Sequence, residues 1–111
     1  MKKLLLLVLG SVVLTGCGGH KQVSPQEAWQ GFCKSIPSAA FNIMTDRQQG
    51  IDKNAALENA KKIQDQHARD YLVSLVEEAY NVPLYEQMAQ KEKAMADFGK
   101  GRYESCVAQQ P

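Results

Sequence analysis

The spacing of apolar side chains after residue 24 constrains the fold more than any other feature of this chain. Apolar residues recur there at steps of three and four, the period of helices that bury one face. No run has the strict alternation of a half-buried strand. The stretches with helical spacing cover residues 25–49, 53–62, 66–79 and 84–98, followed by a short turn before the end. The pattern predicts an all-α domain over residues 24–111, a small bundle of four or five helices.

Residues at the start of the first stretch have the chemistry of a helix N-terminus. Ser24 is the expected cap, Pro25 the first helical residue, and Glu27 completes a capping box. Pro37 interrupts this stretch, because proline lacks an amide hydrogen and its ring clashes with the preceding turn. We therefore expect a kink or a restart there, with Ser35 as a possible second cap.

The other predicted helix ends follow from single residues. Gly50 is the expected left-handed terminator of the first helix. Asp52 and Asp65 are expected to cap the second and third helices, although the matching phase of their stripes also permits one long helix. Pro83 stops that run, since a residue before proline avoids helical angles.

The first 16 residues have the composition of a secretory signal peptide. Lys2 and Lys3 precede an apolar run that is too short to span a bilayer, for which about 20 residues are needed. The run ends in Leu-Thr-Gly-Cys at residues 14–17, which resembles the lipobox of bacterial lipoproteins. The resemblance implies diacylglyceryl transfer to the sulfur of Cys17, cleavage before it, and acylation of the new amino terminus. An ordinary cleaved signal with an incidental cysteine is the alternative.

The lipobox also implies a location in the cell envelope. Residues 17–23 would form a lipidated flexible tether, holding the body within about 20 Å of the membrane. Gly18, rather than an aspartate, follows Cys17. By analogy with enterobacterial sorting, this favours the outer membrane, with the protein facing the periplasm. The covalent lipid on Cys17 is the only cofactor that we expect.

Two cysteines remain once Cys17 is assigned to the lipid. Cys33 and Cys106 would both lie in the oxidising periplasm, where thiols pair. We predict a disulfide between them, which stabilises the fold by roughly 4 kcal/mol in the chain-entropy model. A reactive or metal-binding thiol is the alternative, but it needs a nearby imidazole or a CxxC spacing, and the sequence has neither.

Charge argues against nucleic acid as a partner. The chain has 13 lysines and arginines against 12 acidic residues, and Lys2 and Lys3 belong to the signal peptide. A nearly neutral body lacks the basic patch that binds a phosphate backbone.

Eleven residues from Cys33 to Cys106 form a pattern that is similar to a family of small, uncharacterised secreted helical proteins of Gram-negative bacteria and their phages. The family has an "RQ-x-G" turn and an "AY-x-x-P-x-Y" turn between its first and last cysteines. The matching residues are Cys33, Arg47, Gln48, Gly50, Ala79, Tyr80, Pro83, Tyr85, Tyr103 and Cys106, with Phe98 also in register. The resemblance implies the helical fold and supports the disulfide, but carries no activity. This chain departs from the family by a lipid anchor and a segment bearing Trp29.

Arg47, Trp29 and Tyr85 are the candidate partner-binding residues. Arg47 lies on or beside the apolar stripe of its helix, where it could bind a partner or an anion. The favoured alternative is an ion pair with Asp46, Glu77 or Glu78 that joins the two motif turns. Trp29 and Tyr85 could each serve the core or an interface, because such side chains combine a large apolar ring with a polar group.

The remaining aromatic and sulfur-containing residues are assigned to the core. For Tyr80 and Tyr103 we favour burial of the ring with a hydrogen-bonded hydroxyl. Met44, Met88 and Met95 are expected to fill gaps in the core.

His67 and Asp70 are the residues most suggestive of catalysis or metal binding. Their three-residue spacing could place them on one helix face as a general-base pair or half of a metal site. A structural metal needs about four ligands, and neither a suitable cysteine nor a second histidine is in place. We favour exposed polar residues, and expect no metal site and no catalytic residues.

These features together favour a non-enzymatic binding or accessory lipoprotein with another envelope protein as its partner. Inhibition of a periplasmic hydrolase or blocking of a surface receptor would be specific forms of this function. The alternative is a periplasmic stress chaperone that unfolds in acid, driven by the 12 carboxylates and two histidines.

Overall fold

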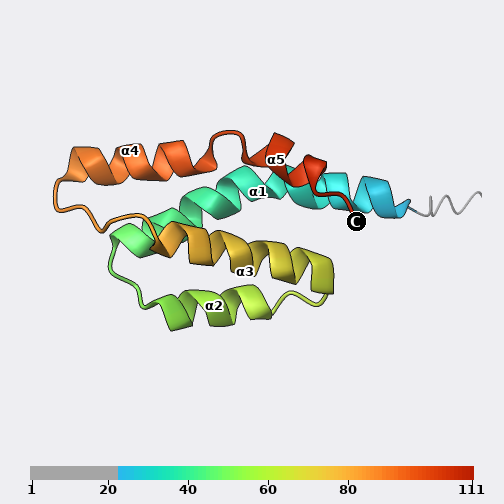
Figure 1. Cartoon of the computed structure of the whole chain (residues 1–111), viewed down its shortest axis with the longest axis horizontal. Helices are drawn as coiled ribbons and strands as arrows, with labels where there is room; N and C mark the ends of the chain where they lie inside the picture. Colours follow the sequence, from blue (N-terminus) through green and yellow to red (C-terminus); the bar gives the residue numbers. More distant parts are fainter. Residues whose placement is uncertain (1–22) are drawn as a thin grey trace, which may run out of the picture.

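A computed structural model describes residues 23–111 as a bundle of five helices (Figure 1). In chain order these are α1 (Pro25–Gln48), α2 (Lys53–Lys61), α3 (Gln66–Tyr80), α4 (Met88–Gly99) and α5 (Arg102–Ala108). The described residues contain no strand, so the predicted all-α class is confirmed. The predicted signal peptide, the lipobox with Cys17, and the tether up to residue 22 lie outside the described residues.

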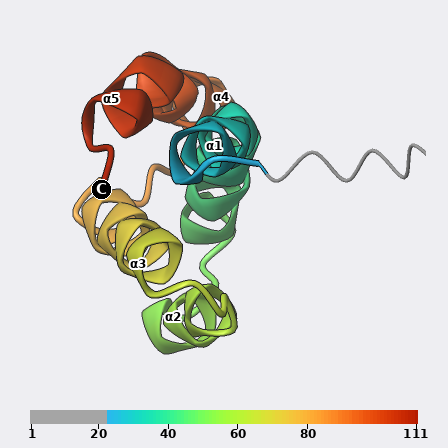
Figure 2. The same cartoon turned by 90° about the vertical axis from the view of Figure 1, so that its right-hand side faces the viewer.

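The long helix α1 is the centre of the bundle. It packs against α4 and α5 on one side and α3 on another, while α2 packs mainly on α3. Figure 2 looks along the bundle and shows this order, from α5 and α4 through α1 to α3 and α2. Every helix except α2 therefore contributes to a core built around α1.

The predicted helix caps are present in the structure. Ser24 accepts a hydrogen bond from the Glu27 amide, and Asp65 accepts one from the Ala68 amide at 2.8 Å. Gly50 has a φ of +78°, as expected of a left-handed terminator. These local signals set where α1 and α3 begin and where α1 ends.

The second and third predicted helices are separate, so the alternative of one long helix is wrong. Asp52 caps α2 through the Asn54 amide, and α2 ends at Lys61 before a turn that leads to Asp65. The turn allows α2 to fold back along α3, where Ala56 and Ala60 are buried. One continuous helix would leave these alanines in solvent.

The expected restart at Pro37 is also wrong, because α1 runs through Pro37 without interruption. Ser35 does not cap a second helix, since its hydroxyl donates to the Phe32 carbonyl at 2.6 Å. Proline removes a single backbone donor, whereas continuity keeps Cys33, Ile36 and Ala40 on one fully buried face. Burial of that face outweighs the lost hydrogen bond.

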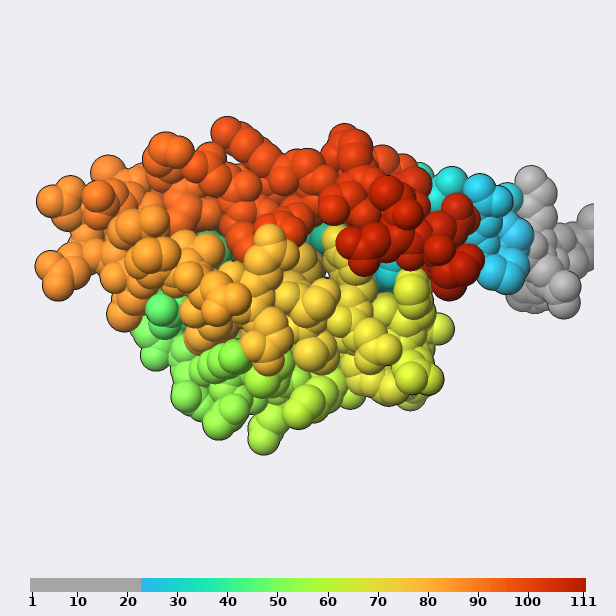
Figure 3. Space-filling model, viewed as in Figure 1, coloured from blue at the N-terminus to red at the C-terminus, as the bar shows by residue number. Residues whose placement is uncertain are grey.

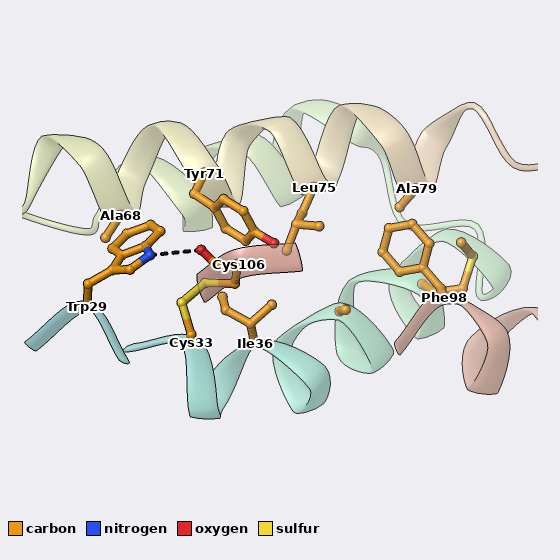
Figure 4. Packing of buried hydrophobic residues seen from close by; sticks show 11 residues of the cluster. Trp29, Cys33, Ile36, Ala68, Tyr71, Leu75, Ala79, Phe98 and Cys106 are labelled. Carbon is orange, nitrogen blue, oxygen red and sulfur yellow. Dashed lines mark hydrogen bonds between the residues drawn. A yellow bond between two sulfur atoms is a disulfide. The ribbon is translucent and has the colours of Figure 1, made fainter. Parts of the chain in front are cut away.

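A main core joins four of the helices and a minor one joins α2 to α3. In Figure 4 the main core runs from Trp29 at one end, past Leu75 and Ile36, to Phe98 at the other. Its buried members are Trp29, Cys33, Ile36, Ala40, Met44, Ala68, Tyr71, Leu75, Ala79, Phe98 and Cys106. The minor core consists of Ala56, Ala60 and Val76.

The predicted disulfide between Cys33 and Cys106 is confirmed. The S–S distance is 2.04 Å, the Cα atoms are 5.5 Å apart, and both residues are fully buried. The bond joins α5 to the first half of α1, and the Trp29 indole donates a hydrogen bond to the Cys106 carbonyl at 2.8 Å (Figure 4). A helix as short as α5 is unstable by itself, so these two links hold it in place.

The start of the last long helix differs from the prediction. Helix α4 begins at Met88 rather than Leu84, and both side chains are exposed, at 65% and 48%. The assignment of Met88 to the core is therefore wrong, whereas Met44 is fully buried and Met95 packs against the main core. Residues 81–87 must cross from α3 to α4, and the proline at 83 keeps that crossing out of a helix.

Candidate functional site

Residues 81–87, which we call the distal loop, lie at the opposite end of the bundle from the start of α1 (Figure 1). The loop and the first turn of α4 form the left-hand end of the molecule in Figure 3. Within residues 23–111 there are five large exposed apolar side chains, and three belong to segments at this end: Ile51, Leu84 and Met88. We refer to exposed Leu84 and Met88, with the loop around them, as the distal surface.

Hydrogen bonds of the Gln48 side chain hold the distal loop on the last turn of α1. Its side chain is only 2% exposed, yet both ends of the amide are hydrogen-bonded. The Nε2 atom donates to the Pro83 carbonyl at 2.9 Å, and Oε1 accepts from the Tyr85 amide at 3.0 Å. A buried amide with both ends satisfied specifies one arrangement of its partners. Gln48 therefore determines the position of the loop backbone on the end of α1.

The sequence prediction did not single out Gln48 as a site residue, although a signal was available. Gln48 follows Met44 by four residues and continues the buried face of α1. A polar residue in phase with an apolar stripe is expected to be buried and to need partners. Its partners lie 35 and 37 residues further along the chain, so they could not be identified without the tertiary structure.

Arg47 holds the first part of the same loop. Its Nε donates to the Val82 carbonyl at 3.0 Å, and the guanidinium lies 5.4 Å from the centre of the Tyr80 ring. The Tyr80 hydroxyl donates to the Ile51 carbonyl at 2.8 Å. Burial, followed by the nearby Asp46 carboxylate, raises the pKa of the Tyr80 hydroxyl, so it stays protonated as the donor. These contacts join the two motif turns.

Two of the three expected acidic partners of Arg47 are engaged elsewhere, and within residues 23–111 no ion pair joins Arg47 to the third, Asp46. Glu77 pairs with Lys53, and Glu78 forms a two-pronged ion pair with Arg102. The predicted pairing of Arg47 with one of these acids is therefore wrong, although the predicted joining of the two turns is correct. A carbonyl and an aromatic face replace the carboxylate because the loop brings them to the end of α1.

Lys91 completes the set of contacts. Its ammonium group, from the first turn of α4, donates to the Gln48 carbonyl at 2.6 Å. A cation near the C-terminal end of a helix is stabilised by the helix dipole. We call Arg47, Gln48 and Lys91 the clamp, since together they bind the loop and α4 to the last turn of α1. The clamp bonds to the Val82 and Pro83 carbonyls and the Tyr85 amide and leaves the Leu84 side chain exposed.

Tyr85 lies within this site and is partly buried. It lines two small hollows, of about 260 and 280 Å³, and Ala94 and Asp97 of α4 line both of them as well. The backbone of Tyr85 belongs to the loop that the clamp holds, while the ring is shared between α4 and solvent. Of the three candidate partner-binding residues, the structure thus brings Arg47 and Tyr85 to the same end of the bundle.

Trp29, the third candidate, lies at the other end and serves the core. Its side chain is 5% exposed, and its ring centre lies 4.9 Å from Phe32, 4.5 Å from His67 and 5.8 Å from Tyr71. With its indole nitrogen bonded to the Cys106 carbonyl, Trp29 leaves little surface for a partner protein. Tyr103 is partly buried and packs against the same core, as expected.

His67 and Asp70 are both exposed, as the favoured interpretation predicted. His67 Nε2 lies 3.1 Å from the Gln109 carbonyl, so the ring is occupied in holding the end of the chain. Among residues 23–111, no three histidine, cysteine, aspartate or glutamate side chains gather closely enough to hold a metal ion. Within that part of the chain, no helix is long and apolar enough to cross a membrane.

None of the protein families, curated proteins or solved structures compared with this chain matches it. The resemblance to small secreted helical proteins stays a prediction. Its residues nevertheless acquire a physical role in this structure. The "RQ-x-G" segment supplies Arg47 and Gln48 of the clamp. The "AY-x-x-P-x-Y" segment comprises the end of α3 and the part of the distal loop that they hold.

Proposed function

We propose that this protein is a lipid-anchored envelope protein that acts as a non-enzymatic binding module. In this proposal the lipid on Cys17 holds it at the outer membrane, facing the periplasm, and the distal surface contacts another envelope protein. Inhibition of a hydrolase and blocking of a receptor are two forms that this activity would take.

The observation that carries the proposal is the combination of a fixed loop backbone with exposed apolar side chains. The clamp satisfies the carbonyls of Val82 and Pro83 and the amide of Tyr85, so the loop has one conformation before any partner arrives. Binding then costs less conformational entropy than binding by a mobile loop. Leu84 and Met88 supply the apolar contacts that a partner pocket would bury.

The position of the distal surface supports the same proposal. The chain enters the bundle at Pro25, and the distal loop lies at the far end of α1 from that point (Figure 1). A lipid attached before Pro25 would hold the near end of the bundle at the membrane. The distal surface would then point away from the bilayer, toward proteins of the periplasm.

Site-specific photo-crosslinking in living cells tests this proposal. A photoreactive amino acid in place of Leu84 is expected to give one discrete crosslinked species of defined mass. The matched control carries the same amino acid in place of Glu58, an exposed residue of α2. Crosslinking at position 84 that is absent, or no different from that at position 58, would contradict a partner at the distal surface.

A further inference from the structure

A cavity of about 500 Å³ lies at the end of the bundle where the chain enters α1. We call it the tether cavity. Its walls come from the first two turns of α1, the turn between α2 and α3, the start of α3 and the end of the chain. The apolar part of the wall includes Pro25, Ala28, Trp29, Phe32, Ile63 and Pro111.

The polar groups at this cavity already have partners inside the protein. The Asp65 carboxylate accepts a hydrogen bond from the Ala68 amide as the cap of α3, and His67 is hydrogen-bonded to the Gln109 carbonyl. The Trp29 indole donates to the Cys106 carbonyl. What remains for a ligand is apolar surface, and the volume is within the range of sites that bind small apolar molecules. The cavity therefore favours a ligand without hydrogen-bonding groups.

The lipid expected on Cys17 is an apolar group attached only a few residues before the cavity wall in sequence. Cys17 precedes Pro25 in the cavity wall by eight residues, which span at most about 29 Å when fully extended. A group on so short a link has an effective concentration in the millimolar range at a site within reach. Even a weak preference of the cavity for an acyl chain would thus suffice to fill it.

We propose that the tether cavity holds one acyl chain of the Cys17 lipid when the protein is outside a bilayer. The inference rests on the lipidation of Cys17, which is part of the proposed function, but not on the distal surface or its partner. In this arrangement Trp29 and Phe32 contact the chain. The cavity shields the acyl chain from water until a membrane receives it.

Trp29 provides the measurement, because it is the single tryptophan of the chain and lines the cavity. Dibromostearic acid is the probe, since bromine quenches indole fluorescence on contact. Two forms are compared in detergent-free buffer: protein purified from cells, with its lipid verified by mass spectrometry, and a Cys17→Ser form exported by an ordinary cleavable signal. We expect saturable quenching of the unlipidated form, and quenching several-fold weaker in the lipidated form, because its own chain occupies the cavity.

Two matched alanine variants locate the bound chain. In the unlipidated form, Ala28→Phe places a ring at the cavity wall and is expected to reduce quenching several-fold. Ala55→Phe adds the same ring to an exposed position of α2 outside the cavity and is expected to leave quenching unchanged. Circular dichroism of both variants verifies that they retain the helical fold.

Several outcomes would overturn the inference. Absence of quenching in the unlipidated form would mean that the cavity does not admit an acyl chain. Equal quenching of the lipidated and unlipidated forms would assign the cavity to free lipid rather than to the Cys17 chain. Equal effects of Ala28→Phe and Ala55→Phe would place the probe elsewhere on the protein. A chain without lipid on Cys17 would overturn this inference together with the anchoring part of the proposed function, while leaving a partner at the distal surface open to crosslinking.

Discussion

Gln48 shows how one side chain can connect segments that are distant in sequence. Its amide lies on the buried face of α1, where the other buried residues are apolar. Removing the two polar groups of the amide from water costs free energy. The two hydrogen bonds to the distal loop offset that cost and make the position of the loop unique. An apolar side chain of similar size would fill the same space without specifying where the loop lies.

Replacement of Gln48 by alanine is expected to destabilise the protein by about 2 kcal/mol, because the Pro83 carbonyl and the Tyr85 amide lose their partner. Chemical denaturation gives the free energy of unfolding. The neighbouring Gln49→Ala variant is the control, because Gln49 is exposed and a change there is expected to cost less than about 0.5 kcal/mol. Equal losses in the two variants would contradict the role of Gln48 in the clamp.

Asp97 illustrates a residue whose pKa is lowered by lysines close to it in sequence. Hydrogen bonds from Lys93 and Lys100 hold the pKa of the Asp97 carboxyl below its usual range. Because the folded pKa lies below that of the unfolded chain, the interaction stabilises the folded state above the unfolded pKa. This stabilisation is lost as the pH falls through the folded pKa.

Replacement of Lys93 by glutamine is expected to raise the pKa of Asp97 toward its ordinary value, because the hydrogen bond from Lys93 is the largest cause of the lowering. The ¹³C chemical shift of the Asp97 carboxyl, followed through an acid titration, measures the change. Lys61→Gln, on α2, serves as the control and is expected to leave this pKa unchanged. A titration of Asp97 that is insensitive to Lys93→Gln would show that the pair does not form in solution.

At the scale of helices, α5 depends on links made from outside itself. It has seven residues, follows Gly101 in a left-handed conformation, and has no side-chain cap. The disulfide to α1, the indole of Trp29 and the ion pair between Arg102 and Glu78 attach it to the bundle. Helix α3, in contrast, has a cap at Asp65 and a broad buried face of its own.

Removal of the disulfide is therefore expected to affect α5 first. A double Cys33→Ala and Cys106→Ala variant should lose about 4 kcal/mol of stability, because the unfolded chain is no longer constrained by the cross-link. Hydrogen exchange should show amides of α5 exchanging faster by local opening, while those of α3 remain the best protected. Retention of full protection in α5 would mean that packing alone holds this helix.

The whole molecule has two ends with different chemistry. One end carries the tether cavity and the point where the chain enters α1, and the other carries the distal surface on its clamped loop (Figure 1). The disulfide and the main core make a rigid connection between them through α1 and α3. Under the proposed function, separation of the two ends would let a lipid and a protein partner be bound without competing for the same surface.

This separation leads to a prediction for the distal surface. A double Leu84→Asp and Met88→Asp variant is expected to keep its helix content and its free energy of unfolding within about 0.5 kcal/mol, because both side chains are exposed. It should lose the crosslinked species detected from a photoreactive residue at position 85. Phe41→Asp changes a comparably exposed apolar residue of α1 and should retain that species. Loss in both variants would point to general apolar association rather than to a specific partner.

Much of the fold could be predicted because its signals are local. Caps at Ser24, Asp52 and Asp65 and the terminator at Gly50 act within one helical turn of the residues that they affect. Pro37 was misjudged because its local cost is outweighed by burial along the whole of α1. The prediction that Met88 belongs to the core was wrong because its spacing continues the apolar stripe of α4 to a residue that lies outside the core.

The candidate site could be predicted only in part, and the reason is the same. Arg47 and Tyr85 stand out by residue type, but the contacts that give them a common place cross 35 residues of sequence or more. Trp29 stands out equally by type, yet it is buried against Cys106, 77 residues away. Residue type alone does not distinguish an aromatic anchor of an interface from one of the core.

The sequence by itself determined the helical class, most helix ends and the pairing of Cys33 with Cys106. The helical class and the helix ends depend on interactions within a few turns, and the pairing was expected because Cys33 and Cys106 are the two cysteines left after Cys17. Only the tertiary structure decided that Gln48 binds the distal loop, that Leu84 and Met88 are exposed, and that a cavity opens beside the start of α1. Those features depend on contacts between segments that are far apart in the sequence. Such contacts are set by the packing of the whole chain.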